Sequence, residues 1–318
     1  MKKLSILLSV AALTGFSACN GGKNDAGTDG LSGSISIDGS STVYPISEAV
    51  AEEFRFGQPD VNVALGESGT GGGMKMFSKG EIDICNASRP IKESEMAACD
   101  SAGIKYLELE IAYDGLAVMV HPSNNWVDKL TVAELKMIWE SAAQGKIKTW
   151  NQIRPEWPNK EIHLYGPGTA SGTYEYFTEV ICGKKGDSRG DYNANEDDNT
   201  LVKGIAGDEG ALGYFGMAYY ENNSDKLKIV PVDNNNGGVI PTQETVLSGT
   251  YAPLSRPLYI YINEKALSKP EVLAFVHFYI DNVEKLCKEV GYVPLKSEEY
   301  TEMKAKVAAY DKATMEKE

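Results

Sequence analysis

Residues 34–65 read SISIDGSSTVYPISEAVAEEFRFGQPDVNVAL, and the fold depends on the alternation within this stretch. The short apolar run at 34–37 predicts a strand, and a second strand is predicted at 61–65. The segment between them predicts a helix, because its apolar residues recur on one helical face: Ile46, Ala49, Val50 and Phe54. A strand, a helix and a second strand in this order are typical of layered α/β architecture.

The same alternation continues along the chain. Further strands are predicted at 82–85, 115–120, 162–165 and 256–263, and helices at 74–77, at 132–145 and within 269–292, where a proline suits the first turn. The strands at 115–120 and 256–263 bracket the middle of the chain, so we expect them to cross between two lobes. One lobe would then contain residues 34–118 and 258–318, and the other residues 119–257. No internal repeat is evident, which excludes solenoids and propellers.

The N-terminus carries the pattern of an export signal. Two lysines precede an apolar stretch from Leu4 to Leu13, which is too short to span a membrane. The sequence Phe16-Ser17-Ala18-Cys19 is typical of a bacterial lipoprotein processing site, so we expect residues 1–19 to be a signal peptide with Cys19 as the lipidated residue. Residues 20–33 are polar and glycine-rich, as in a flexible tether.

Composition narrows the range of partners. The net charge of -14, without a basic patch, argues against nucleic acid, although a small anion still responds to local dipoles. The three histidines and four remaining cysteines show no metal-ligand spacing, so no metal or other cofactor is expected. Export permits disulfides between Cys85, Cys99, Cys182 and Cys287, but buried free thiols explain the same residues equally well.

Three turns rich in Gly, Ser and Thr each lead from a strand into a helix. They lie at 39–43, where Ser41 or Thr42 would cap the helix, at 66–75 (GESGTGGGMK), and at 165–173, where the helix opens with Ser171, Gly172 and Thr173. The second run is not a nucleotide phosphate loop. Counted from Gly66, Gly72 occupies the place that needs lysine, and the residue after Lys75 is Met76 where a hydroxyl residue is needed. Each turn alone could be an ordinary helix start, but three together favour an oxyanion site beyond the strand ends.

Arg89 is a fourth candidate. It follows a predicted strand in the segment ASRPIKESE at 87–95. An arginine in such a place is often a surface ion-pair residue, yet its planar fork also suits phosphate or sulfate. Because it follows a strand end, as the other turns do, we favour the ligand role.

Taken together, five segments resemble one known family. They are IDGSSTVYPISEAVAEEF, GESGTGGGMKMFSKGEIDICNASRPIKESE, YGPGTASGTYEYF, GALGYFGMAYY and GYVPL. In this combination and order they resemble the phosphate-binding receptor of bacterial ABC-type phosphate importers, in a lipoprotein form. The resemblance implies a two-lobed, type II periplasmic-binding-protein fold, a non-enzymatic role, a monomer, and transfer of phosphate to a membrane permease. It also implies that the site contains Ser41, Thr42 with the Val43 backbone, Ser68 or Thr70, Ser171, Gly172 and Thr173.

Two positions depart from the family pattern. Well-known members have an aspartate where this chain has Arg89, and an arginine where it has Pro167. The change keeps a cation in the cleft but removes the carboxylate that accepts the phosphate proton and so excludes sulfate. Glu67 or Asp83 could replace that carboxylate.

Two other functions fit the sequence less well. A sensor or store of a sulfate-like oxyanion would use the same residues without a permease. An exported serine hydrolase would need Ser68 or Ser171 as nucleophile, but Thr70 and Thr169 stand where the Gly-x-Ser-x-Gly motif requires glycine.

Overall fold

The computed structural model describes residues 30–169, 171–195 and 197–315. The expected signal peptide, Cys19 and the first part of the tether therefore lie outside the described residues. Within those ranges, no helix combines the length and the apolar composition that crossing a membrane requires.

The first part of the fold is a sheet whose strands follow the predicted alternation. β1 (Gly33–Gly39) lies between β2 (Val61–Leu65) and β3 (Ile84–Ala87), and all three are parallel. β11 (Ser255–Asn263) returns from far along the chain and pairs antiparallel with both β3 and β4 (Tyr106–Val120). Parallel strands joined through helices place their carboxyl ends, and the turns that follow, at one edge of the sheet.

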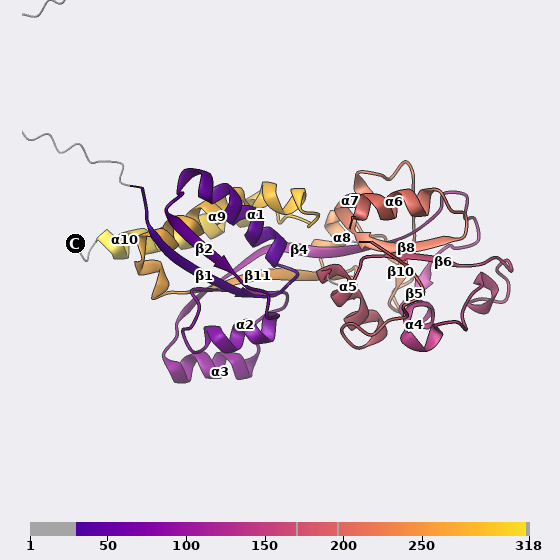
Figure 1. The fold of residues 1–318 in the computed structure, drawn as a ribbon, viewed down its shortest axis with the longest axis horizontal. Coiled ribbons are helices and arrows are strands. Elements are labelled where there is room, and N and C mark those ends of the chain that lie inside the picture. The colour runs from indigo at the N-terminus through magenta and orange to yellow at the C-terminus, as the bar shows by residue number, and fades with distance from the viewer. Residues whose placement is uncertain (1–29, 170, 196, 316–318) are drawn as a thin grey trace, which may run out of the picture. The chain divides into compact units, whose positions relative to one another are not determined.

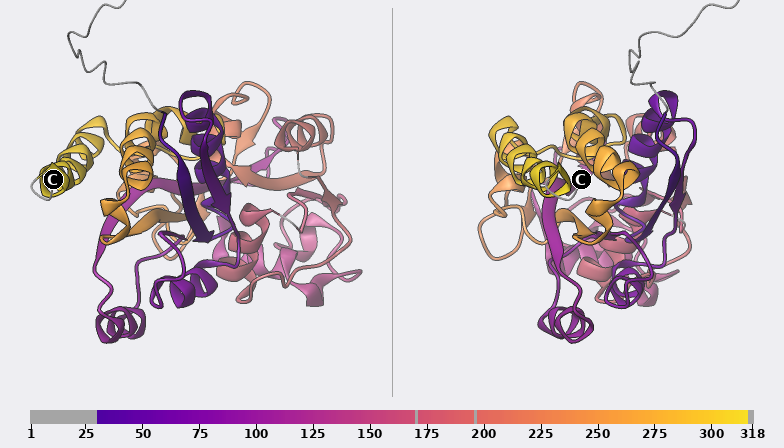
Figure 2. Two further views of the ribbon diagram at one scale, coloured as in Figure 1. Left: turned by 60° about the vertical axis from the view of Figure 1, so that its left-hand side comes forward. Right: turned by 90° about the vertical axis from the view of Figure 1, so that its left-hand side faces the viewer.

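Helices cover both faces of this sheet (Figure 1). One face packs against α1 (Tyr44–Gly57) and α9 (Pro270–Glu289) in a core that includes Phe54, Ile84 and Phe275. The other face packs against α2 (Thr70–Phe77) and α3 (Glu93–Ala102). The C-terminal helix α10 (Ser297–Met315) lies beside α9, as Figure 2 shows.

The long strand β4 extends into the second part of the fold. Residues 106–110 and 112–115 pair with β11 on either side of a register shift, and residues Leu116–Val120 pair instead with β8 (Ala211–Gly216). Beyond β8 the sheet continues through β6 (His163–Gly166) to β7 (Asn193–Ala194), while β9 (Lys228–Ile229) pairs with β4. β4 and β11 therefore run side by side where the two parts meet (Figure 1).

The second part has its own set of short elements and its own core. The core packs Trp139, Phe177 and Tyr214 around β8, with the Phe177 and Tyr214 rings stacked 3.6 Å apart. The remaining elements are β5 (Leu130–Thr131), α4 (Val132–Trp139), α5 (Gly172–Phe177), a π-helical turn (Thr178–Cys182), α6 (Asp198–Ala206), α7 (Met217–Glu221), β10 (Val232–Asp233), α8 (Gln243–Leu247) and the 3-10 turns Ser141–Ala143, Trp150–Gln152 and Ala266–Ser268.

The α/β class and most elements agree with the sequence prediction, but several boundaries differ: β4, for example, begins at Tyr106, nine residues before the predicted 115. β3 begins two residues later than predicted, at Ile84, and α4 ends at Trp139 rather than near Gly145 because Glu140 is extended. The sequence left open whether the cysteines form disulfides or are free thiols. In the structure Cys85, Cys99, Cys182 and Cys287 are buried free thiols. The division into lobes stays a prediction, which the separate cores at 35–112 with 258–307 and at 116–254 support.

Candidate oxyanion site

A cavity of about 390 Å³ lies where several of the predicted turns meet. The turn before α1, the start of α2, the segment after β3, one face of α5 with the turn that follows, and the first part of β11 all contribute to its wall. The lining residues are Ser40, Ser41, Thr42, Gly69, Thr70, Gly71, Ser88, Arg89, Glu175, Tyr176, Glu179, Val180, Lys185 and Arg256. Residues from both expected lobes thus face one small polar space.

Ser41 and Thr42 line the cavity, but neither caps α1. The helix begins at Tyr44 with Val43 at the cap position and no side-chain cap bond, so the cap prediction is wrong. The physical reason is a tight turn in which the Val43 and Tyr44 N–H groups donate to the Ser40 carbonyl at 3.1 and 3.0 Å. The two hydroxyls are thereby free to face the cavity. Val43 itself is fully buried and does not line it.

The glycine-rich run contributes Thr70 rather than Ser68. α2 begins at Thr70, whose hydroxyl lies 3.2 Å from the Ser88 hydroxyl and accepts the Ser88 N–H at 3.1 Å. Ser68 instead donates its hydroxyl and its N–H to Asp38 at 2.6 and 2.9 Å, and it does not line the cavity. Of the two alternatives, Thr70 is the one that the structure places at the site.

Arg89 lines the cavity and is also an ion-pair residue. Its two terminal nitrogens donate to the two Glu95 oxygens at 2.9 and 2.7 Å, in a fork-to-fork arrangement. Burial raises the pKa of Glu95, but the bonds from Arg89 and from the Lys92 backbone outweigh it and lower that pKa overall. The ion pair expected of a surface arginine is therefore present, and the ligand role of Arg89 stays a prediction that its place in the cavity wall supports.

Arg256 is a site residue that the sequence analysis did not identify. It stands directly opposite Asp114 where β11 pairs with β4, and its guanidinium contacts that carboxylate at 3.2 Å. The same nitrogen donates to the Thr42 hydroxyl at 2.7 Å, and the guanidinium carbon lies 3.7 Å from the centre of the Tyr176 ring. Burial raises the pKa of Asp114, and Arg256 opposes that rise.

The Ser-Gly-Thr turn forms a helix start as predicted, but the following residues line the cavity. The Ser171 hydroxyl caps α5 by accepting the Thr173 N–H at 3.2 Å, and neither residue reaches the cavity wall. Gly172 lies against Thr42, because a methyl group added to it would fall 2.9 Å from the Thr42 Cα. Gly172 therefore brings the two sides of the cleft together, and Glu175 and Tyr176 face the cavity.

The carboxylates that the sequence analysis considered are not at the cavity. Asp83 precedes β3 at the opposite end of the strand, where it binds Ser36 and Lys269, and Glu67 is absent from the lining. The lining carboxylates are Glu175 and Glu179. Glu175 accepts the Ser41 hydroxyl across the cleft at 2.7 Å and Lys185 at 2.6 Å.

Each of the three cations in the cavity wall has a carboxylate partner: Arg89 with Glu95, Arg256 with Asp114, and Lys185 with Glu175. The cavity therefore offers oriented hydroxyl and N–H donors with little excess charge. Such a wall can replace the water shell of an anion, since hydrogen bonds to charged groups are the strong ones.

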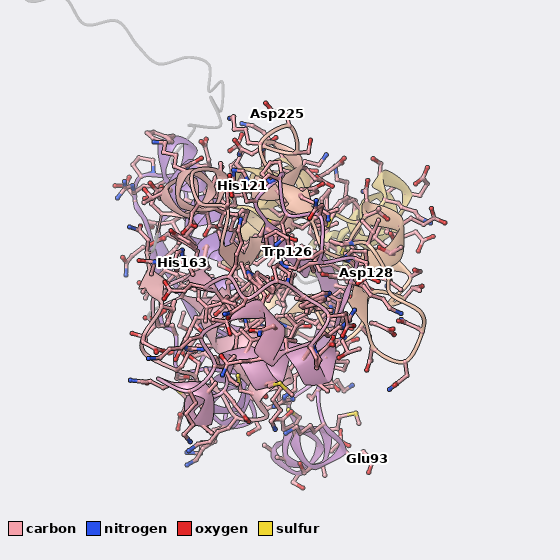
Figure 3. All side chains as sticks on the ribbon, turned by 90° about the vertical axis from the view of Figure 1, so that its right-hand side faces the viewer. Glu93, His121, Trp126, Asp128, His163 and Asp225 are labelled. Carbon is pink, nitrogen blue, oxygen red and sulfur yellow. The ribbon has the colours of Figure 1, made fainter. Side chains whose placement is uncertain are left out.

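The hydrolase interpretation finds no support at this cavity. None of its lining residues is a histidine. His121 bonds only to the nearby Ser123 at 2.7 Å, and His163 bonds to Asp208 at 2.7 Å; both are labelled in Figure 3. Among residues 30–169, 171–195 and 197–315, no group of three His, Cys, Asp or Glu side chains could hold a metal ion.

Comparison with known proteins identifies the family of this chain. A family model described as a PBP superfamily domain matches residues 24–283. Protein SphX of Synechococcus elongatus is 52% identical over 268 residues, covering 84% of this chain and 79% of its own. The phosphate-binding protein PstS of Staphylococcus saprophyticus is 42% identical over 311 residues, covering 96% and 95%. The crystal structure of a possible phosphate binding protein from Planctomyces limnophilus has 45% identity and a TM-score of 0.83, covering 88% and 99%.

The chain therefore belongs to the PBP superfamily, in the family of the PstS phosphate-binding proteins. The resemblance drawn from the sequence is confirmed, as is the expected fold class. This family consists of binding receptors and not of enzymes, so the expected non-enzymatic role is confirmed as well.

Proposed function

We propose that this protein captures inorganic phosphate in the cleft between two lobes and delivers it to an ABC-type permease. The names of its relatives support phosphate as the ligand, and the cavity has a matching chemistry. Its binding residues would be Ser41, Thr42, Thr70, Arg89 and Arg256, with Ser88 and the N-terminal end of α2 as further donors.

The observation that carries the proposal is the convergence of Thr42, Thr70 and two arginines on one cavity although they are far apart in sequence. A tetrahedral anion has oxygens pointing in several directions, so it needs donors from several sides. Arginine and hydroxyl groups supply strong bonds of that kind. Four residues predicted as ligands do not line the cavity and would support the site without contacting phosphate: Val43, Ser68, Ser171 and Thr173.

The remaining parts of the proposal concern location and assembly. Residues 1–19 would direct export, Cys19 would carry the lipid anchor, and 20–33 would tether a monomeric two-lobed body outside the cytoplasmic membrane. The apolar stretch and the processing site in the sequence support this, as do the phosphate-binding relatives. Cleft closure over the ligand would give the permease a shape that it can distinguish from the empty receptor.

Titration calorimetry tests the proposal. Protein purified from membranes in mild detergent would be freed of ligand by unfolding and refolding, and then titrated with phosphate and with sulfate near neutral pH. We expect tight binding of phosphate and much weaker binding of sulfate. Binding of neither anion would refute the proposal, and equal binding of both would favour a general oxyanion receptor. Co-purification with a permease separates a transport receptor from a sensor.

A further inference from the structure

The loop after α9, residues 291–295, packs into both hydrophobic cores at once. The side chain of Val293 is 5% exposed and belongs to the core around β8, together with Leu116 and Leu254. Its neighbour Tyr292 and the nearby Leu295 belong instead to the core around α9. Adjacent residues of one loop thus pack into the cores of both parts of the fold.

Val293 is also bonded to the strand that carries Asp114. The N–H of Val293 donates to the Tyr113 carbonyl at 2.9 Å, and the Tyr113 N–H donates to the Val293 carbonyl at 2.8 Å. On the other side of Asp114, a methyl group added to Gly115 would fall 3.5 Å from a Val293 methyl carbon. The loop therefore contacts β4 immediately before and after Asp114, which holds Arg256.

Tyr292 lies close to the same ion pair. Burial raises the pKa of its phenol; the Asp114 carboxylate raises it further, and the Arg256 guanidinium lowers it. The side chain is only 8% exposed and belongs to the core around α9. Two consecutive loop residues, Tyr292 and Val293, thus lie near the Asp114 position.

The loop also contacts the second part of the fold through Gly291 and Pro294. A methyl group on Gly291 would fall 2.7 Å from a ring carbon of Tyr219, and the Gln243 amide lies 3.5 Å from the Pro294 carbonyl. A surface hollow of about 210 Å³ is lined by Tyr292, Val293 and Pro294 of the loop together with Gln243. Contacts beside such a hollow can change when the two parts rotate, which a close-packed interior would resist.

We infer that loop 291–295 is a third connection between the two lobes, and that Val293 is a positioning residue that fixes Arg256 in the anion cavity through Tyr113 and Asp114. The inference takes phosphate as the ligand from the proposed function. It also assigns a role to the segment GYVPL (291–295), which does not line the anion cavity. Rotation of the lobes and placement of the Arg256 donor are then coupled through one loop.

The test compares Val293→Ala with Val202→Ala in the full chain. Val202 lies on α6, is 3% exposed and belongs to the same core, so its truncation removes the same two carbons from that core, away from the loop. Each variant is measured for phosphate affinity, for its urea midpoint, and for the distance between spin labels at Glu53→Cys and Glu156→Cys without phosphate. Both label positions are exposed, one in each expected lobe.

We expect Val293→Ala to weaken phosphate binding about tenfold and to broaden the label distances. Val202→Ala should lower the urea midpoint to a similar extent while leaving affinity and distances as in the unchanged protein. The inference is overturned if Val293→Ala alters affinity and distances no more than Val202→Ala does. If the unchanged protein fails to bind phosphate, the proposed function fails, and the label distances still test the loop.

Discussion

Arg256 contacts groups from three distant parts of the chain: Thr42, Asp114 and Tyr176. Its side chain is 15% exposed and that of Asp114 is 3% exposed, so the ion pair is shielded from water. A buried pair is costly to break, because the remaining charge has no partner. Arg256 is therefore both a charged donor in the cavity wall and a link between that cavity and the paired strands β4 and β11.

The first prediction concerns Arg256→Ala. Two charged hydrogen bonds are worth about 3 kcal/mol, so phosphate affinity should fall about a hundredfold. The affinity of Arg256→Lys should fall less, because lysine keeps the charge but lacks the planar fork of arginine. Calorimetry gives the affinities. In Arg256→Ala alone, the Asp114 carboxylate is left buried without its partner. The double variant Arg256→Ala, Asp114→Asn removes that charge, so weaker phosphate binding by the folded double variant reflects the loss of Arg256 as a ligand. Unchanged affinity in the double variant would remove Arg256 from the site.

A second prediction concerns Glu175 and the selectivity of the site for phosphate over sulfate. A carboxylate in the wall repels an anion without a proton and accepts a bond from one that carries a proton. Glu175→Gln should therefore raise sulfate affinity by about tenfold or more, whereas phosphate should bind no more tightly than before. Competition between the two anions in calorimetry measures this. Glu179→Gln is the matched control, one helical turn away in the same wall; a gain of sulfate binding only in the control would transfer the role to Glu179.

The residues of the site show why sequence reasoning found some and missed others. Thr42, Thr70 and Arg89 each follow a strand end, a position that local pattern can identify. Arg256 begins a predicted apolar strand, and its partners lie 142 and 214 positions away, so nothing next to it in sequence marks it as a ligand. Asp83 was considered because it is acidic and near Arg89, but the direction of β3 carries it to the opposite edge.

At the scale of elements, the strands and helices were largely predictable because their apolar periodicity is strong. β2 has the predicted bounds, and α9 begins at the predicted proline, Pro270. The start of α1 was less predictable, because Ser41 and Thr42 are common cap residues and only tertiary contacts show that they serve Glu175 and Arg256 instead. Hydroxyls that do not cap a helix remain available to a ligand.

The start of α5 supports a third prediction, on Gly172→Ala. Alanine suits the first turn of a helix, so the free energy of unfolding should change by less than about 1 kcal/mol. The added methyl would nevertheless lie 2.9 Å from the Thr42 Cα and keep the two sides of the cleft apart. We expect phosphate affinity to fall about tenfold, mainly through faster dissociation, which stopped-flow kinetics measures. An unaltered dissociation rate would show that Gly172 is not needed for closure. Gly57→Ala, at a position with open space and no positive φ, serves as the control for handling and expression.

At the scale of the whole molecule, residues from both expected lobes line the cavity, and the strand β4 contributes side chains to both cores. A ligand held in such a cavity binds only when both parts are folded. Its binding free energy therefore adds to the stability of both parts together, not to one alone. This is a property of the assembled fold, and no single segment of sequence predicts it.

The last prediction follows from that linkage. Phosphate at a hundred times its dissociation constant should add about 2.7 kcal/mol to the free energy of unfolding and raise the melting temperature of the whole body as one transition. For about 285 residues, a gain of this size corresponds to several degrees in scanning calorimetry. Sulfate at the same concentration should have little effect, because Glu175 repels it. Two separate transitions, only one of which moves with phosphate, would show that the anion is held by a single lobe and that the cleft described here is not where it binds.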